Sequence, residues 1–307
     1  MEFIASHRNI CGAITYHTFG GVHLRPLSFK PDDDMPTEDL WVFKLIGKRA
    51  TETTGYPAVS VFHDFRYHPK EIMTGAFDDW AYDQLGIFAW TTELWDIVGR
   101  SGVKDRRFID WNRDHPEADD LGILKWNDEN LAGAGFVNWA PFEHPQLGPV
   151  EIGGWDTLWT WRNPPHRFLE EEIAKNCRFS LLQASLAPRL VARHLAAEPV
   201  GGGASKITLV LENEGFLPTY VSRRALERKM SRAVRIEIEG GVLVSGERVT
   251  EIGHLEGRSN KLDWTSNSAT DNRVRREWVV RGEAGDRVVL HVISERAGSI
   301  HPEVRLA

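Results

Sequence analysis

The sequence is poor in cysteine and holds no long apolar or basic run. Its 307 residues include two cysteines, too few for a disulfide framework. No apolar stretch approaches the ~20 residues that cross a bilayer, so we expect no membrane span. No Lys/Arg block is longer than a pair and the net charge is −7, which argues against nucleic acid and anionic membrane surfaces as partners.

The N-terminus also lacks a basic segment followed by an apolar core. MEFIASHRNI is therefore not expected to be a signal peptide, and the compartment stays unknown. Cys11 falls in an expected strand and Cys177 in an expected helix, and both are predicted to be buried small hydrophobes. The length suggests about two domains, and 41% hydrophobic residues suffice for a core.

An aromatic and β-branched run follows Gly86. Residues 87–95, IFAWTTELW, have strand length, and a run this apolar is expected to be buried on both faces of an α/β sheet. Glu93 lies near the C-terminal end of this strand, where open α/β sheets place their sites. A carboxylate there is costly unless it has partners or a function. Taken alone, Glu93 is more simply interpreted as an ion-paired residue at a strand end.

A second segment changes that balance. Residues 12–26, GAITYHTFGGVHLRP, predict a strand ending in His17, a glycine break and a second short strand. His17 and Glu93 are therefore both expected at strand C-termini of one sheet. A histidine and a carboxylate in that position form a plausible site.

These segments resemble the zinc carboxypeptidases of the carboxypeptidase A and B type. The matching motifs are YHTF (16–19), DWAY (79–82), Gly86-Ile87 and TTEL (91–94), in register apart from one extra residue at Gln84-Leu85. The resemblance covers roughly residues 1–195, with a large insertion. It implies an enzyme that releases C-terminal residues from peptides or proteins with a Zn²⁺ cofactor.

The resemblance also assigns roles to single residues. His17 would be the third zinc ligand and Glu93 the general base that takes a proton from the zinc-bound water. Tyr67 would be the mobile tyrosine that closes over the substrate. Asp78 would line the pocket for the C-terminal side chain, as in the carboxypeptidase B type that takes Lys and Arg. Asp78 fits equally well as a helix cap.

The family's other zinc ligands lie in a His-x-x-Glu motif well upstream of the third ligand. Only sixteen residues precede His17, and the His-x-x-Glu of His68 and Glu71 comes in the wrong order, so we interpret it as chance. The arginines that hold the substrate also lie upstream in the family. The chain is thus expected to be the C-terminal part of a longer protein. Its zinc site would be incomplete, and it would be inactive without the upstream half of the catalytic domain.

The expected fold is α/β: a partial carboxypeptidase-like mixed sheet with flanking helices, followed by an all-β immunoglobulin-like sandwich. Residues 1–198 form the first part, 199–205 a glycine-rich linker and 206–307 the sandwich, where apolar residues alternate with period two. A helix closes the first part, with an apolar stripe expected to be buried. Its members are Leu169, Ile173, Cys177, Leu181 and Ala184.

Residues 96–165 form a long insertion rich in tryptophan, proline and glycine. Its tryptophans are predicted to be the core of a structured loop, although they could also be sugar platforms. Two rival functions remain. One is a non-catalytic binding module acting through the sandwich. The other is a glycoside hydrolase using Asp78, Asp79 and Glu93, which the sequence does not place as a facing pair.

Overall fold

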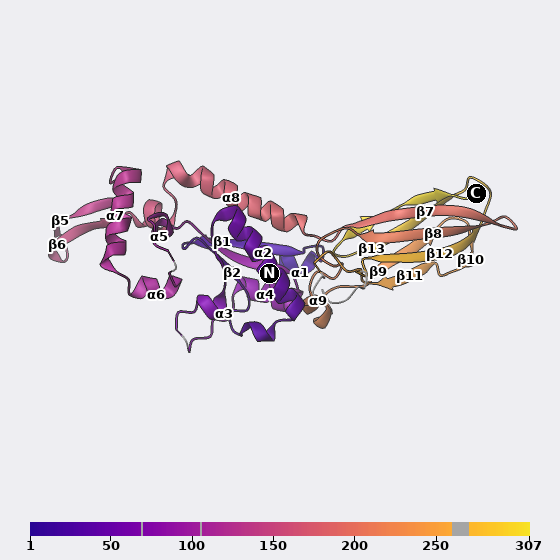
Figure 1. Cartoon of the computed structure of the whole chain (residues 1–307), viewed down its shortest axis with the longest axis horizontal. Helices are drawn as coiled ribbons and strands as arrows, with labels where there is room; N and C mark the ends of the chain where they lie inside the picture. The colour runs from indigo at the N-terminus through magenta and orange to yellow at the C-terminus, as the bar shows by residue number, and fades with distance from the viewer. Residues whose placement is uncertain (69, 105, 260–269) are drawn as a thin grey trace.

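The computed structural model describes residues 1–68, 70–104, 106–259 and 270–307. The molecule is elongated and consists of three parts along its long axis (Figure 1). The insertion lies at one end, a four-stranded sheet with its helices in the middle, and an all-β part at the other end. The expected mixed α/β class is confirmed. No helix among the described residues is both long enough and apolar enough to cross a membrane.

The central sheet is mixed. It contains β1 (Gly12–Thr18), β2 (Val22–Arg25), β3 (Ala58–Ser60) and β4 (Phe88–Leu94), in the order β1-β4-β2-β3. β1 runs parallel to β4, whereas β2 is antiparallel to β4. β3 ends at Ser60, because the Ser60 hydroxyl accepts from the His63 N–H and starts the short helix α3 (Val61–Asp64).

Helices cover both faces of this sheet. α2 (Thr37–Thr54) and α8 (His166–Ser185) lie on the face of Phe88 and Trp90, and their contacts include Phe43 and Phe179. α4 (Phe77–Leu85) packs through Ala81 and Leu85 against the other face. Two short elements, α1 (Glu2–Ser6) and the 3₁₀ turn η1 (Asp32–Asp34), complete this part.

The apolar stripe predicted for α8 is wrong as a core face. Leu169, Ile173 and Leu181 are 36, 58 and 66% exposed, and Cys177 is exposed too. The buried side chains of α8 are Glu172, Asn176 and Phe179. The helix begins and ends close to where the sequence predicted, but it turns its polar residues inward and leaves its aliphatic stripe in solvent.

The insertion is a structured unit. It comprises α5 (Ile97–Arg100), α6 (Phe108–Arg113), α7 (Glu117–Leu131), the hairpin β5 (Phe136–His144) and β6 (Gly148–Trp155), and the π-helix η2 (Thr157–Arg162). A core of its own contains Trp95, Trp111, Trp126, Trp155 and Trp161. The prediction that the tryptophans pack as a core is confirmed for these. Trp139 and Trp159 remain 61 and 43% exposed.

Two sheets packed face to face form the C-terminal part. One has the order β10-β12-β8-β7 and the other β11-β9-β13-β14, with β15 also paired to β13. Alternating side chains from both sheets, such as Leu209, Ile236 and Leu290, share one core. The strands are β7 (Leu190–Gly201), β8 (Ala204–Asn213), β9 (Val234–Glu239), β10 (Val242–Ser245), β11 (Val249–Gly253), β12 (Arg273–Arg281), β13 (Arg287–Ser294), β14 (Gly298–Ile300) and β15 (Glu303–Arg305).

The linker predicted at 199–205 is wrong. These residues are the end of β7, a turn and the start of β8, with Pro199 paired to Ser205 and Gly201 to Ala204. Gly201, Gly202 and Gly203 have φ of 90, 62 and 69°, values that glycine adopts without strain. The glycine run therefore makes a hairpin turn. The junction between the two parts lies between the end of α8 and Leu190.

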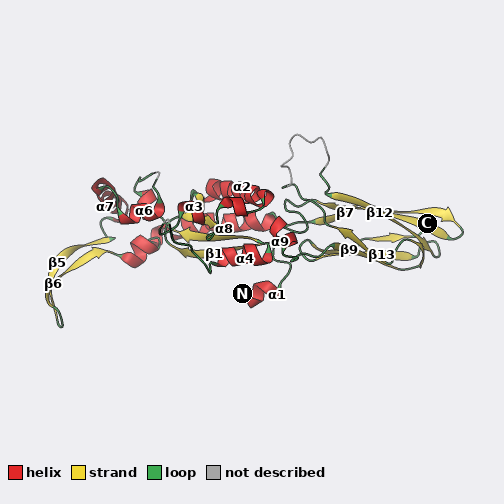
Figure 2. Cartoon of the chain, turned by 90° about the horizontal axis from the view of Figure 1, so that it is seen from below, coloured by secondary structure: helices red, strands yellow, loops and turns green. Residues whose placement is uncertain are grey.

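The two parts are held together at this junction by hydrogen bonds. The Ser222 hydroxyl, before α9 (Arg223–Glu227), donates to the Gly86 carbonyl at 2.7 Å. The Asp39 carboxylate accepts the backbone N–H groups of Arg223 and Arg224. Arg296, at the end of the loop after β13, donates to the Leu85 carbonyl at 3.0 Å. The sandwich is thus docked directly on α4 (Figure 2).

Candidate functional site

His17 and Glu93 are direct partners in the parallel ladder between β1 and β4. Both lie within the last two residues of their strands, and register partners in a sheet point to the same face. The structure therefore brings together the two residues that the sequence placed at strand ends. His17 is exposed, whereas Glu93 is partly buried.

Burial dominates the electrostatics of Glu93. It raises the pKa of this carboxyl from 4.5 to about 7, and among the described residues no cation opposes this rise. Gly20 contributes to this burial, since a Cβ built on it would lie 3.1 Å from Glu93 Oε2. Gly20 has a φ of 152° and donates its N–H to the Trp95 carbonyl. The glycine break thus lets the chain fold closely over the carboxylate.

Asp78 lies on the same side of the sheet, deeper than Glu93. It is 2% exposed and interacts with Thr91, which lies two residues before Glu93 and therefore on the same face of β4. Thr91 in turn bonds Thr15 of β1 at 3.1 Å. Burial, and then repulsion from Asp79, raise the pKa of Asp78 to about 7.

The environment of Asp78 is not that of an N-cap. The N-cap of α4 is Ala76, and Asp78 lies within the first turn of the helix. Its Oδ2 is buried without a hydrogen-bond partner among the described residues, as is Oδ2 of Asp79. Asp79 accepts the Ser28 N–H at 2.9 Å through its other oxygen. Two neighbouring carboxylates in such a state are costly, which is typical of a functional site.

Tyr67 is not brought to this site. It lies in the loop between α3 and α4, is 47% exposed, and among the described residues forms no hydrogen bond to His17 or Glu93. Phe65 in the same loop is buried against Phe108 of the insertion. His68 and Glu71 of the reversed motif also lie in this loop, where the Glu71 N–H donates to the His68 carbonyl.

The described residues contain no group of three or more His, Cys, Asp or Glu side chains that could hold a metal ion. His17 is the one zinc ligand that the family resemblance assigns to this chain. The donor set of the described residues therefore does not fit a complete zinc site.

Sequence reasoning missed a polar network on the opposite face of the sheet. His23 is fully buried, with its two ring nitrogens 2.9 Å from the Thr92 hydroxyl and 2.8 Å from the Thr54 hydroxyl. Burial, and then the charge of Lys175, lower its pKa to about 3, so it is neutral. The alternation in Val22-His23-Leu24 would by itself place His23 on the solvent side of a half-buried strand, whereas β2 is buried on both faces, so the local sequence did not signal this site.

Glu172 of α8 is the centre of a second buried group on that face. It accepts from Tyr56, Arg100 and Lys175, and these partners hold its pKa below the ordinary value despite its burial. The Tyr56 hydroxyl also accepts the Trp95 N–H at 2.8 Å. This network holds the turn that follows Glu93 and so supports the candidate site from the opposite face of the sheet.

One comparison with known protein families matches the C-terminal part of the chain. Residues 189–305, which coincide with the sandwich and make up less than half of the chain, match the model of a domain of unknown function, DUF8731. No curated protein matches the chain.

Two solved structures show a weak likeness. DesR, a β-glucosidase from Streptomyces venezuelae in complex with D-glucose, is 11% identical over 39% of this chain and 15% of its own, with a TM-score of 0.19. A GH20 exo-β-N-acetylglucosaminidase from Vibrio harveyi in complex with N-acetylglucosamine is 8% identical over 39% of this chain and 18% of its own, with a TM-score of 0.18. The chain thus spans less than a fifth of either protein, and such scores support no argument about fold or function.

Proposed function

We propose that this chain supplies the general base, Glu93, and one metal ligand, His17, of a carboxypeptidase-type hydrolase that releases C-terminal residues from peptides. The observation that carries the proposal is the register pairing of His17 with Glu93 at two parallel strand ends, with the Glu93 pKa at about 7. A base with this pKa is suited to take a proton from water and to pass it on near neutral pH.

Asp78 would select the substrate side chain. Its carboxylate is buried and partly unsatisfied beside Thr91, which precedes Glu93 by two residues in β4, so a Lys or Arg side chain would find its counter-ion there. A cation beside Asp78 would also return its pKa toward the ordinary range. An apolar side chain would leave the carboxylate unpaired, which favours cationic over aliphatic C-terminal residues.

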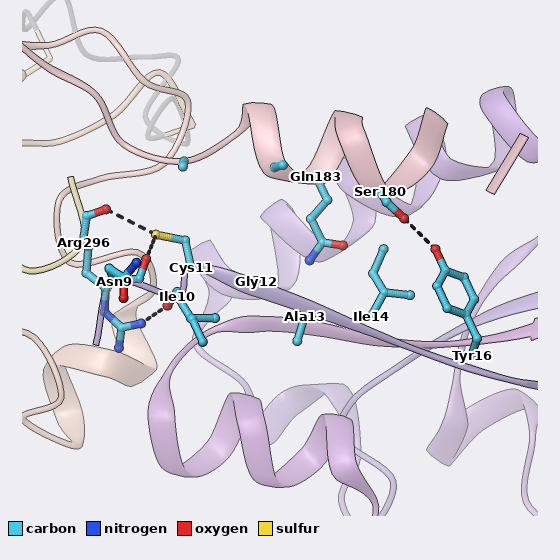
Figure 3. A pocket seen from close by; sticks show the side chains of 12 residues that line it. Asn9, Ile10, Cys11, Gly12, Ala13, Ile14, Tyr16, Ser180, Gln183 and Arg296 are labelled. Carbon is cyan, nitrogen blue, oxygen red and sulfur yellow. Dashed lines mark hydrogen bonds between the residues drawn. The ribbon is translucent and has the colours of Figure 1, made fainter. Parts of the chain in front are cut away.

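The remaining metal ligands would come from another polypeptide segment, and three surface features support a partner on that side. β1 is an edge strand, paired among the described residues with β4 alone. A cavity of about 470 Å³ runs between β1 and α8, lined by Ile14, Tyr16 and Gln183 (Figure 3). The aliphatic stripe of α8 is exposed beside it. A segment adding a strand to β1 and packing on α8 would satisfy all three.

At the level of fold, we propose that the central sheet is carboxypeptidase-like and that the sandwich is immunoglobulin-like. The order β1-β4-β2-β3, with strand-end residues on β1 and β4, supports the first assignment. Two packed sheets of short antiparallel strands over about a hundred residues support the second.

The proposal is tested on the purified chain and on the complex that a tagged copy forms in its own host. The chain alone is expected to hold no zinc tightly and to release no residue from blocked dipeptides ending in Lys. The host complex is expected to hold one zinc per chain and to be active. In that complex Glu93→Gln should abolish turnover and keep the zinc, whereas His17→Ala should lose both.

Three outcomes would overturn the proposal. A complex that is free of zinc and inactive on peptides would favour the hypothesis of a non-catalytic binding module. Cleavage of aryl glycosides by the complex, dependent on Glu93, would establish the glycosidase alternative. Full peptidase activity in the Glu93→Gln complex would remove the general base on which the proposal rests.

A further inference from the structure

The negative charge of the chain is concentrated in one segment. Residues 117–160 contain eight Asp and Glu and one basic residue, Lys125, which gives 1 − 8 = −7. The whole chain also has a net charge of −7, so the rest of the molecule is neutral overall. We call residues 117–160 the acidic arm. It comprises α7, the β5–β6 hairpin and the start of η2, at the end of the molecule farthest from the sandwich (Figures 1 and 2).

The acidic arm also exposes large apolar side chains. Its hairpin is a two-stranded sheet with both outer edges open among the described residues, and such a hairpin is marginally stable in water without a covering element. Exposed residues on the hairpin and beside it include Val137 at 63%, Trp139 at 61%, Phe142 at 43%, Leu147 at 73% and Trp159 at 43%. Apolar surface gathered in this way marks an interaction site.

Some acidic residues of the arm have a structural use and others do not. Asp119 accepts from the Trp111 indole, and Asp156 caps η2. Asp128, Glu143 and Glu151 are exposed, and among the described residues none of the three forms a salt bridge. These three carboxylates are exposed to solvent and are not needed as ion-pair partners within the fold.

We propose that the acidic arm binds a basic polypeptide segment of a partner protein, in which Lys or Arg alternates with apolar residues. Arg and Lys side chains would pair with Asp128, Glu143 and Glu151, and an Arg would lie over Trp139. An open cavity of about 510 Å³ has room for one cationic side chain beside its three carboxylates, Asp128, Glu129 and Asp156, although His166 and Arg167 also line it. Apolar residues of the segment would cover the hairpin, and its backbone would add to an open hairpin edge.

Charge argues against other occupants of this surface. Two arms facing each other would bring together two surfaces of charge −7 and repel, which argues against a contact between the arms of two copies. Nucleic acids and anionic membranes would be repelled for the same reason. The inference does not depend on the hydrolase proposal, because the arm lies outside the His17–Glu93 site and none of its residues has a role there.

The test uses the full chain and two short labelled peptides, one of alternating Arg and Leu and one of alternating Glu and Leu. The Arg-Leu peptide should bind, with an affinity that falls as the salt concentration rises. The Glu-Leu peptide should not bind. The variant Asp128→Lys/Glu143→Lys/Glu151→Lys should bind the Arg-Leu peptide at least about tenfold more weakly. Trp139→Ala should lose affinity as well, whereas Trp41→Ala, at an exposed tryptophan of α2, should not.

A matched control separates local from overall charge. Glu247→Lys/Glu251→Lys/Glu283→Lys makes the same change in net charge at exposed positions of the sandwich and should leave binding unchanged. Equal losses in the two triple variants, or equal binding of both peptides, would overturn the proposal. So would sedimentation of the chain as a dimer that Trp139→Ala dissociates, or tight binding to phosphatidylcholine vesicles, since the arm would then be a self-contact or a membrane surface.

Discussion

The two faces of the central sheet differ in how their buried ionisable side chains are partnered. On the α2 and α8 face, His23 has a partner for each nitrogen, and Glu172 has three donors. On the α4 face, Glu93 and Asp78 are buried, and among the residues that the structure describes neither carboxylate has a cationic partner and one oxygen of Asp78 has no hydrogen-bond partner.

The pKa directions express this difference. Partners lower the pKa of Glu172, whereas burial raises the pKa of Glu93 and Asp78 to about 7. Buried polar groups that are fully paired hold a fold together, and those left unpaired cost stability and tend to carry chemistry. The first face is therefore interpreted as scaffold and the second as the candidate site.

The largest expected effect is on the scaffold face. Glu172→Ala would leave the Arg100 and Lys175 charges and the Tyr56 hydroxyl without their acceptor, so we expect the free energy of unfolding to fall by about 3–5 kcal/mol. Chemical denaturation measures this. Glu171→Ala is the matched control, because Glu171 pairs with the same Arg100 but is 61% exposed, and its loss should cost at most about 1 kcal/mol.

On the α4 face, removing a buried carboxylate should stabilise the protein rather than destabilise it. Glu93 has a folded pKa of about 7 against an ordinary 4.5, so between these values the folded state binds more protons than the unfolded chain. The contribution of Glu93 to the free energy of unfolding should therefore fall as pH rises through this window and stay level above it. Glu93→Gln removes this term, so the variant should gain about 2 kcal/mol relative to the parent between acid and neutral pH.

Denaturation of both proteins across this pH range measures the effect as a difference. The difference cancels His23, whose low pKa makes stability rise with pH over a range that overlaps the same window. A difference that stays constant with pH would mean that Glu93 is solvated in the folded state. The α4 face could then no longer be distinguished from the scaffold face by a buried carboxylate without a cationic partner.

The sequence predicted the strand ends because their signals are local. The apolar run before Glu93 and the glycine break after His17 fix where β4 and β1 end, and the structure pairs the two residues as expected. The buried face of α8 depends instead on distant partners. Glu172 is inside because Arg100, Lys175 and Tyr56 satisfy it, while the apolar stripe that the helical period marked lies in solvent.

The prediction of a linker at residues 199–205 was wrong for a related reason. Three consecutive glycines are typical both of a flexible connection and of a hairpin turn, and only the pairing of Pro199 with Ser205 decides between them. Tyr67 was assigned from the family resemblance across a loop of unusual length, and loop paths are not fixed by local sequence.

A smaller effect is expected between the two carboxylates of α4. Asp79 is the second cause, after burial, of the raised pKa of Asp78, so Asp79→Asn should lower the Asp78 pKa by a fraction of a unit from about 7. The amide keeps an oxygen that accepts the Ser28 N–H. NMR titration of the Asp78 carboxyl measures the shift. Asp83→Asn, one helical turn further along α4, is the control and should leave the Asp78 pKa in place.

The smallest expected effect separates the two histidines. His17 is exposed at the end of an edge strand, so His17→Ala should change the free energy of unfolding by less than about 0.5 kcal/mol. His23→Ala should cost about 2 kcal/mol or more, because it leaves a cavity and removes the partner of the buried Thr92 hydroxyl, whereas the Thr54 hydroxyl still donates to the Ala50 carbonyl. Chemical denaturation of both variants gives the comparison. If His17→Ala costs as much as His23→Ala, His17 stabilises the fold as His23 does. The interpretation of His17 as a metal ligand would then lose its support.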